Sequence, residues 1–246
     1  IVSKYFYNFS IQSLKFYSDD SKIAGISLYN YEFTEALCTD GFYPFHAIND
    51  DADIYFMKVP GSWGLTLNNN MWTEFNKWYD QHLDINEQDK IPNYVKTWPK
   101  TSWKKHFFHY MIAQDKYFVY PRISYSTNFN DKGTSDTVVD QLFQVPLSLT
   151  DNTLRLKKFI DSPVIYDEYF EITAKTLNIF SPQLKEFDYQ VDLYGVKNLE
   201  LINEKYLLTS RKTNKSLFSW GKGMQPHILN IINDIQGDIF SLTIKT

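Results

Sequence analysis

Several features on which common protein classes depend are scarce in this sequence of 246 residues. It has one cysteine, Cys38, which excludes an internal disulfide and favours a reducing, cytoplasmic compartment. It has no run of about 18 apolar residues, so no membrane span is expected. The formal net charge is −4, and only Arg122, Arg155 and Arg211 are arginine, so the charge does not indicate a nucleic-acid partner.

The short motifs of several enzyme classes are absent as well. There is no G-x-G-x-x-G motif, no P-loop and no G-x-S-x-G, so a dinucleotide enzyme, a kinase and a serine hydrolase are not favoured. A Rossmann-like transferase within residues 150–246 would need a glycine-rich turn between a strand and a helix. The stretch "VDLYGVKN" offers only one glycine for that turn.

Aromatic residues, by contrast, are plentiful at 17% of the chain. Aromatic side chains are common where proteins stack against sugars. An AT-rich genome, however, also favours phenylalanine, tyrosine, lysine, asparagine and isoleucine codons together. The total therefore does not indicate a function, and the positions of individual aromatic residues have to carry the argument.

Apolar patterns of helical period alternate with short apolar runs that are typical of buried strands. Ser3 is the predicted N-cap of the first helix. Helices are expected over residues 3–16, 65–83, 101–114, 152–160, 167–180 and 224–237. Strands are expected over residues 23–31, 54–59, 116–121, 188–196, 205–211, 216–220 and 238–244. The alternation predicts an α/β fold with a partly parallel sheet. The sequence pattern changes after residue 147, so a domain boundary is placed between residues 147 and 148.

Five pieces of sequence follow one another in an ordered series. They are "IYFMKVPGSWG" (54–64), "MWTEFNKW" (71–78), "TSWKKHFFHY" (101–110), "KYFVYPRIS" (116–124) and "STNFNDKGTS" (126–135). The series resembles the acceptor half of bacterial family-two glycosyltransferases, which have the A-type nucleotide-sugar fold. It is more distantly similar to enzymes of the N-acetylglucosaminyltransferase I type. The resemblance covers residues 1–145, since residues 2–30 are similar to the stretch that follows the metal-binding acidic motif of those enzymes.

This resemblance implies a partial A-type glycosyltransferase fold. Residues 1–147 would form its acceptor-side half, and residues 148–246 would form a small α/β C-terminal extension. The nucleotide-binding strands and the Asp-x-Asp motif would precede Ile1, so the chain is expected to be a fragment that is inactive alone. A divalent Mn²⁺ or Mg²⁺ ion is expected in the full-length enzyme, bound mainly by the missing half.

The implied function is transfer of a sugar from a nucleotide-sugar donor to a cell-surface or exopolysaccharide glycan. The alternative is a non-catalytic module that binds a carbohydrate or a protein. The sequence upstream of Ile1 would separate the two, because an acidic triplet at a strand end there supports the enzyme.

The loop at residues 59–64 is the leading candidate for a sugar site. Ser62, Trp63 and Gly64 are expected to bind substrate, since an indole on a rigid loop offers a flat partner to the C–H face of a pyranose. Gly61 and Gly64 would let the backbone approach a ligand closely. The alternative is that the Trp63 side chain packs inward and anchors the loop to the core.

The next helix carries the predicted proton acceptors. Eukaryotic relatives have paired aspartates after the tryptophan, where this chain has Lys104 and Lys105. His106 is a candidate general base, and His109 lies about one helical turn later on a similar face, as a further base or a substrate contact. Trp103 would shape the acceptor wall. Both histidines would otherwise be ordinary packing or surface residues.

Glu74 is the third catalytic candidate, because it falls where relatives carry a glutamate on a helix. Its alternative role is that of a solvated surface residue. The neighbouring Trp72 and Trp78 have helical spacing and are expected to have core or half-core packing.

The loop at residues 126–135 supplies the last group of candidates. Asn128, Gly133 and Thr134 are predicted to bind substrate, and Asp131 is a possible base or ribose contact. Ser135 stands where bacterial relatives often have a histidine near the donor phosphates.

Asp51 and Asp53 mimic a metal-binding Asp-x-Asp motif at the end of an apolar run. They would be metal ligands if this chain were the entire enzyme, because Mn²⁺ and Mg²⁺ prefer carboxylate oxygens. A solvated acidic turn is the favoured interpretation, so no metal site is assigned within the chain.

Overall fold

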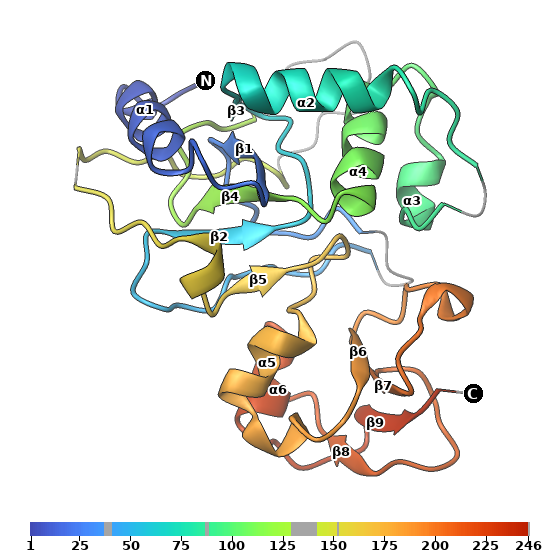
Figure 1. The fold of residues 1–246 in the computed structure, drawn as a ribbon. Coiled ribbons are helices and arrows are strands. Elements are labelled where there is room, and N and C mark those ends of the chain that lie inside the picture. The colour runs from blue at the N-terminus through green and yellow to red at the C-terminus, as the bar shows by residue number, and fades with distance from the viewer. Residues whose placement is uncertain (37–40, 87–88, 129–141, 152, 246) are drawn as a thin grey trace.

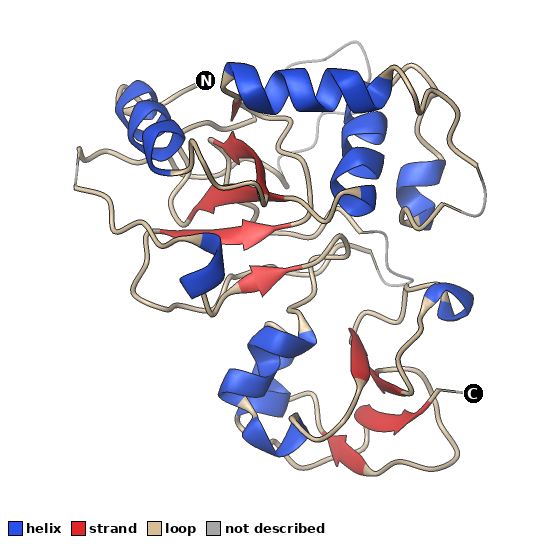
Figure 2. Cartoon of the chain, in the orientation of Figure 1, coloured by secondary structure: helices blue, strands red, loops and turns tan. Residues whose placement is uncertain are grey.

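The computed structural model describes residues 1–36, 41–86, 89–128, 142–151 and 153–245. Helices and strands alternate along the chain, and the strands form two separate mixed sheets (Figures 1 and 2). The predicted α/β class is therefore confirmed. No helix in these ranges combines the length and the apolar character that crossing a membrane requires.

The first sheet has five strands in the order β3-β1-β4-β2-β5. They are β3 (Leu65–Thr66), β1 (Ile23–Ser27), β4 (Tyr117–Pro121), β2 (Ile54–Met57) and β5 (Ile165–Tyr166). Strands β1 and β4 are parallel, β2 is antiparallel to β4, and β5 is parallel to β2. Every residue of β1, β2 and β4 is buried, as expected of strands covered on both faces.

Alternate residues of these strands pack against different helices. Ile54 and Phe56 belong to the group that includes Phe9 of α1 (Phe6–Phe16). Tyr55 and Met57 belong to the group that includes residues of α2 (Asn69–Tyr79), α3 (Asn93–Lys96) and α4 (Trp103–Ala113). The sheet thus lies between α1 on one face and α2 and α4 on the other.

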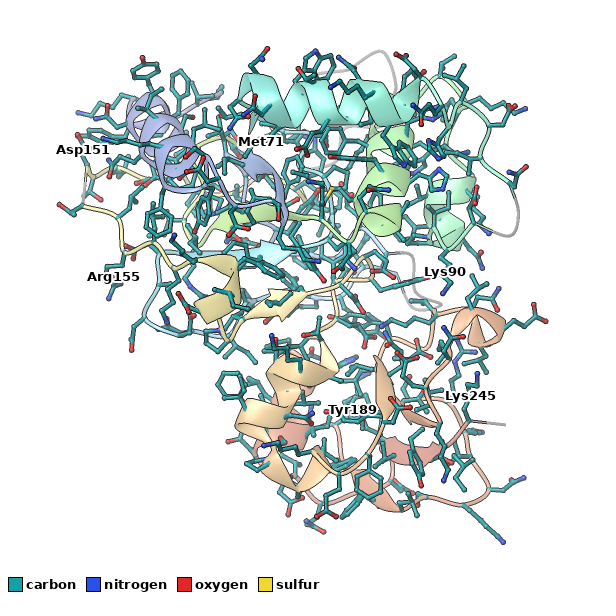
Figure 3. The ribbon with its side chains drawn as sticks, in the orientation of Figure 1. Met71, Lys90, Asp151, Arg155, Tyr189 and Lys245 are labelled. Carbon is teal, nitrogen blue, oxygen red and sulfur yellow. The ribbon has the colours of Figure 1, made fainter. Side chains whose placement is uncertain are left out.

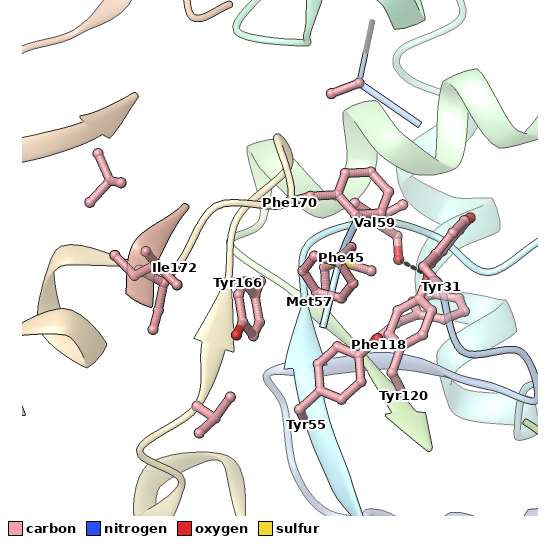
Figure 4. Packing of buried hydrophobic residues seen from close by; sticks show 14 of the residues in the cluster. Tyr31, Phe45, Tyr55, Met57, Val59, Phe118, Tyr120, Tyr166, Phe170 and Ile172 are labelled. Carbon is pink, nitrogen blue, oxygen red and sulfur yellow. Dashed lines mark hydrogen bonds between the residues drawn. The ribbon is translucent and has the colours of Figure 1, made fainter. Parts of the chain in front are cut away.

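The group that includes Tyr55 and Met57 contains the aromatic core of the molecule, which Figure 4 shows from close by. Tyr55 and Tyr120 stack with ring centroids 5.5 Å apart, and the Tyr120 hydroxyl donates to the Val59 carbonyl at 2.8 Å. Trp78 is buried as predicted, whereas Trp72 is 49% exposed. The expectation of core or half-core packing is therefore right for Trp78, whereas Trp72 keeps about half of its surface exposed beside Phe75.

Side-chain caps set the start of the two central helices. Asn68 accepts the Met71 N–H at 2.8 Å before α2, and Ser102 accepts the Lys105 N–H at 3.4 Å before α4. Ser3 does not cap α1, which begins at Phe6. Its hydroxyl donates instead to the Ser148 carbonyl at 2.6 Å.

The second sheet has four strands in the order β6-β7-β9-β8. They are β6 (Tyr189–Asp192), β7 (Tyr206–Thr209), β9 (Phe240–Ile244) and β8 (Phe218–Trp220), with helices α5 (Ala174–Phe180) and α6 (Ile228–Ile232) beside them. Short 3-10 turns η1 (Phe159–Asp161), η2 (Pro182–Leu184) and η3 (Leu199–Leu201) join the elements. Because β5 pairs with β2, the first sheet includes a strand from beyond the predicted boundary at residues 147 and 148.

Several predicted helices are wrong or too long. The helix expected over 224–237 is limited to Ile228–Ile232, and the helix expected over 65–83 begins only at Asn69, because Leu65 and Thr66 form β3. Residues 153–158 form no regular structure and residue 152 lies outside the described part of the chain, so η1 is all that remains of the helix expected over 152–160. The guanidinium and backbone N–H of Arg155 bind Asp53 there, on the flank shown in Figure 3. The helix expected over 167–180 starts only at Ala174, because the Asp167 carboxylate accepts two backbone N–H groups and forms a turn.

Candidate functional site

A hollow of about 400 Å³ lies where the chain leaves β1 and β4. It is lined by Ile1, Val2, Trp63, Gly64, Ser126, Thr127 and Asn128. Strands β1 and β4 are parallel, so their carboxyl ends meet at the same edge of the sheet. That edge is where ligands commonly bind in α/β folds.

Backbone hydrogen bonds hold the segments around this hollow together. The Leu28 N–H, just after β1, donates to the Gly64 carbonyl at 2.9 Å. The Ser126 N–H donates to the Leu28 carbonyl at 3.0 Å, and the Thr127 N–H donates to the Ile1 carbonyl at 3.0 Å. The start of the chain, the tryptophan loop and the segment after β4 therefore form one connected rim.

The two glycines of the loop are needed for close packing against the protein itself. Gly64 has φ of +105°, and an added Cβ would lie 2.9 Å from the Ser126 hydroxyl. A Cβ on Gly61 would lie 2.7 Å from the Ser27 hydroxyl. At both positions the missing Cβ lets the loop approach other parts of the chain closely, and Gly64 also lines the hollow.

The Trp63 ring combines the two roles expected of it, as part of a ligand site and as an anchor of the loop to the core. Trp63 is half-buried and lines the hollow. Its indole also packs inward, with ring centroids 4.7 Å from Tyr29 and 5.0 Å from Phe143. The Lys104 ammonium lies 5.9 Å from the centre of the same ring. Aromatic and cationic neighbours therefore fix the ring, and the residue remains part of the wall of the hollow.

Lys104 is the residue through which α4 reaches Trp63. Its ammonium pairs with the Glu35 carboxylate at 2.7 Å, and the two side chains are only 10% and 13% exposed. It also lies 5.2 Å from the ring centre of Trp98. Sequence reasoning missed this pair, because Glu35 lies in an irregular segment 69 residues away in the chain.

The other residues of the Lys-Lys-His motif bind backbone rather than a ligand. The Lys105 ammonium donates to the carbonyls of Lys96 and Trp98 at 2.7 and 2.8 Å. Its burial, with the charge of Lys100 nearby, lowers the pKa of Lys105. The His106 Nε2 atom lies 2.8 Å from the Lys100 carbonyl. The motif thus fastens the turn between α3 and α4.

The predicted residues of α4 do not line the hollow. His106 is 5% exposed, and its ring packs edge-on against Tyr79. His109 is 8% exposed, lies 3.6 Å from the Asp89 carboxylate, and has a pKa lowered by burial. Trp103 is 46% exposed and contacts Phe107. The helix turns Lys104 towards Trp63, so these three side chains lie on its other faces.

The remaining predicted residues are dispersed. The Glu74 carboxylate pairs with Lys116 at 2.8 Å. Neither Glu74 nor Ser62 lines the hollow. Asn128 does line it. Asp131, Gly133 and Thr134 lie outside the described residues. Ile1, Val2, Ser126 and Thr127 line the hollow without having been predicted. Ser126 and Thr127 belong to the quoted stretch 126–135 but were not singled out within it.

The acidic turn is neutralised by basic side chains. Asp50 pairs with Arg122 at 2.8 Å and Lys157 at 3.1 Å, and Asp53 pairs with Arg155 at 2.8 Å. Burial alone would raise the pKa of Asp53, but the hydrogen bonds and charge of Arg155 outweigh it and lower that pKa. Within the described ranges, no group of three or more histidine, cysteine, aspartate or glutamate side chains is arranged to hold a metal ion. These residues do not fit a divalent-ion site.

Comparison with known proteins adds no assignment. No protein-family model matches the chain, and no curated protein sequence matches it either.

Proposed function

We propose that this chain forms the acceptor side of a glycosyltransferase and holds a sugar residue in the hollow beside Trp63. One observation carries the proposal. Trp63, Gly64 and Asn128 come from two motifs more than 60 residues apart, and they line one hollow at the carboxyl ends of parallel strands. The sugar would pass from a nucleotide-sugar donor to a cell-surface or exopolysaccharide glycan.

The chemistry of the lining supports a sugar as occupant. The described lining residues offer an indole, hydroxyl groups and an amide, and none of them has a charged side chain. A pyranose presents an apolar C–H face and neutral hydroxyls, which suit such a wall. A diphosphate would lack cationic partners there, so we assign the hollow to the acceptor sugar rather than to the nucleotide.

A divalent ion is part of the proposal only for the full-length enzyme. Of the two carboxylates that the sequence offers, Asp53 is bound to Arg155, whereas Asp51 is exposed and forms no ion pair among the described residues. The neighbouring Asp50 is bound to Arg122 and Lys157. No catalytic step is therefore assigned to a metal bound by the residues described here. Mn²⁺ or Mg²⁺ would accompany the nucleotide diphosphate outside this hollow.

None of the described candidates for the proton acceptor lines the hollow. His106, His109 and Glu74 are held by packing or ion pairs away from the hollow. Asp131 lies three residues after Asn128 in the sequence. It stays the sequence-based candidate for the base or a ribose contact, and it lies outside the described residues.

The test compares two tryptophans in the full-length protein. Release of nucleoside diphosphate is measured with common nucleotide sugars, Mn²⁺ and oligosaccharide acceptors. Trp63→Ala is expected to lower kcat/KM for the acceptor by about fivefold, since an aromatic contact contributes about 1 kcal/mol. Trp63→Phe should keep part of the activity. Trp103→Ala is the matched control, because that exposed ring is not part of the hollow, and it should leave activity unchanged.

A second function remains in competition because none of the described base candidates reaches the hollow. A non-catalytic carbohydrate-binding module would bind oligosaccharides through Trp63 and release no nucleoside diphosphate. Saturation-transfer NMR with neutral oligosaccharides separates the two functions. Binding without turnover across all common donors favours the module. If the protein shows no binding and no turnover, both functions are refuted.

A further inference from the structure

A second cleft, larger than the hollow beside Trp63, lies at the opposite end of the parallel strands. Its volume is about 680 Å³. Its walls come from the end of α1 and the turn that follows, the residues before β4, η1, and the start of α5. None of the residues discussed for sugar binding takes part in it.

Two of the three carboxylates that line this cleft are bound by the protein itself. The Asp115 carboxylate pairs with Lys22 and, at 2.9 Å, with Lys58. Burial alone would raise the pKa of Asp115, but the bonds from these two lysines outweigh it and lower that pKa. Asp20 accepts the backbone N–H of Lys22 at 3.1 Å.

Three lysines around the cleft have no carboxylate partner. Lys15, Lys158 and Lys175 line it, and none of them forms an ion pair with any residue that the structure describes. Among the lining residues, the four ammonium groups of Lys15, Lys22, Lys158 and Lys175 stand against the three carboxylates of Asp19, Asp20 and Asp115, a local balance of +1. This excess of positive charge occurs in a chain whose net charge is −4.

Apolar side chains stand beside these lysines. Phe16 is 40% exposed and Ile160 is 74% exposed, and both line the cleft. Phe159 also lines the cleft, with its ring centroid 4.7 Å from that of Tyr117. Exposed apolar residues next to uncompensated lysines are the surface that a ligand with an anionic head and an apolar body would cover.

We propose that this cleft binds a phosphate group that is joined to an apolar body. The phosphate would lie among Lys15, Lys158 and Lys175, since lysine ammonium groups bind phosphate as point charges. The apolar body would cover Phe16 and Ile160. The site is separate from the hollow beside Trp63, so it does not depend on the proposed transferase function.

The experiment uses three probes: inorganic pyrophosphate, soluble dihexanoyl phosphatidate, and phosphatidylcholine vesicles with and without long-chain phosphatidate. Calorimetric titration measures the soluble probes, and flotation measures the vesicles. The triple variant Lys15→Gln, Lys158→Gln, Lys175→Gln is expected to bind the soluble phosphatidate at least about tenfold more weakly. The matched control is Lys77→Gln, Lys212→Gln, Lys215→Gln, which removes the same charge away from the cleft and should keep the affinity.

The apolar part is tested separately by Ile160→Ser. This exposed substitution should weaken phosphatidate binding and leave pyrophosphate binding unchanged. Binding to phosphatidate vesicles as well as to the soluble lipid would identify a membrane as the source of the phosphate. Binding to the soluble probe alone would identify a free phosphorylated compound. The proposal is overturned if phosphatidate does not bind, or if both triple variants lose the same affinity.

Discussion

His227 makes the stability of the second sheet depend on pH. Its side chain is 4% exposed and packs against Tyr43, Tyr194 and Phe240, with ring centroids 4.7, 5.6 and 5.1 Å away. Neither ring nitrogen forms a hydrogen bond of ordinary geometry in the described part of the chain, and a backbone contact with Leu193 acts only weakly against the lowering of its pKa. Burial, followed by the charge of Lys222, lowers the pKa of His227 to about 4.

The size of the effect follows from proton linkage. In the unfolded chain His227 takes up a proton near its ordinary pKa of about 6.5, so acid favours the unfolded state before the folded state can be protonated. With a folded pKa of about 4, the loss of stability is about 1.4 kcal/mol at pH 5.5 and about 2.6 kcal/mol at pH 4.5. The loss of stability reaches its full size only below pH 4, and it vanishes above about pH 7.

Urea unfolding followed by tryptophan fluorescence at pH 7.5, 5.5 and 4.5 measures this loss. His227→Phe keeps an aromatic ring among aromatic neighbours and should flatten the pH dependence by the amounts above. Glu171, whose pKa burial raises to about 8, titrates in both proteins, so its contribution cancels in the comparison. His227→Gln should flatten the profile equally, even if its stability at neutral pH differs. An unchanged pH dependence in both variants would refute the explanation.

Three further substitutions test the rim and the helices. Gly64→Ala should cost about 1–3 kcal/mol of unfolding free energy, because φ of +105° and the Ser126 hydroxyl at 2.9 Å both oppose a Cβ; equal urea midpoints would contradict this. Glu35→Gln leaves the buried Lys104 ammonium without its counter-charge and should cost about 3 kcal/mol, whereas adding Lys104→Met should recover much of it in the same assay. Asn68→Ala should cost about 1 kcal/mol by removing the cap of α2, and no change in thermal midpoint would argue against the cap.

The central strands and helices were predictable because local patterns and tertiary packing agree there. The strands β2 and β4 are uninterrupted apolar runs, and the structure buries each of their residues. Asn68 and Ser102 precede α2 and α4 as caps. Local sequence therefore carries enough information to place these elements.

The failures come from contacts that are distant in the sequence. Residues 153–158 have apolar positions compatible with a helix, but Leu154 and Leu156 alternate with Arg155 and Lys157, which also suits an extended chain. The bonds of Arg155 to Asp53 and of Lys157 to Asp50 select the extended form. Partners more than 100 residues away cannot be read from a local pattern.

The candidate site was predictable only in part, for a similar reason. The ordered motifs placed Trp63 and Asn128 in one site, and the structure does bring them to one hollow. The motif around Trp103 also pointed there, but the orientation of α4 presents Lys104 instead. Which face of a helix turns towards a site depends on its packing, and Glu35, which holds Lys104, follows no recognisable pattern.

The attachment of α4 to the turn before it depends little on the side chains of that turn, apart from Trp98, whose ring packs against Tyr94 and Phe108. Lys105 and His106 grip three main-chain carbonyls, those of residues 96, 98 and 100, and every amino acid provides such an oxygen. Mutations that alter the side chains of the turn keep these three bonds as long as the backbone path is unchanged. Replacing either gripping residue removes bonds that nothing in the turn can restore. Homologues of this protein should therefore keep Lys105 and His106 while the amino acids of the turn vary.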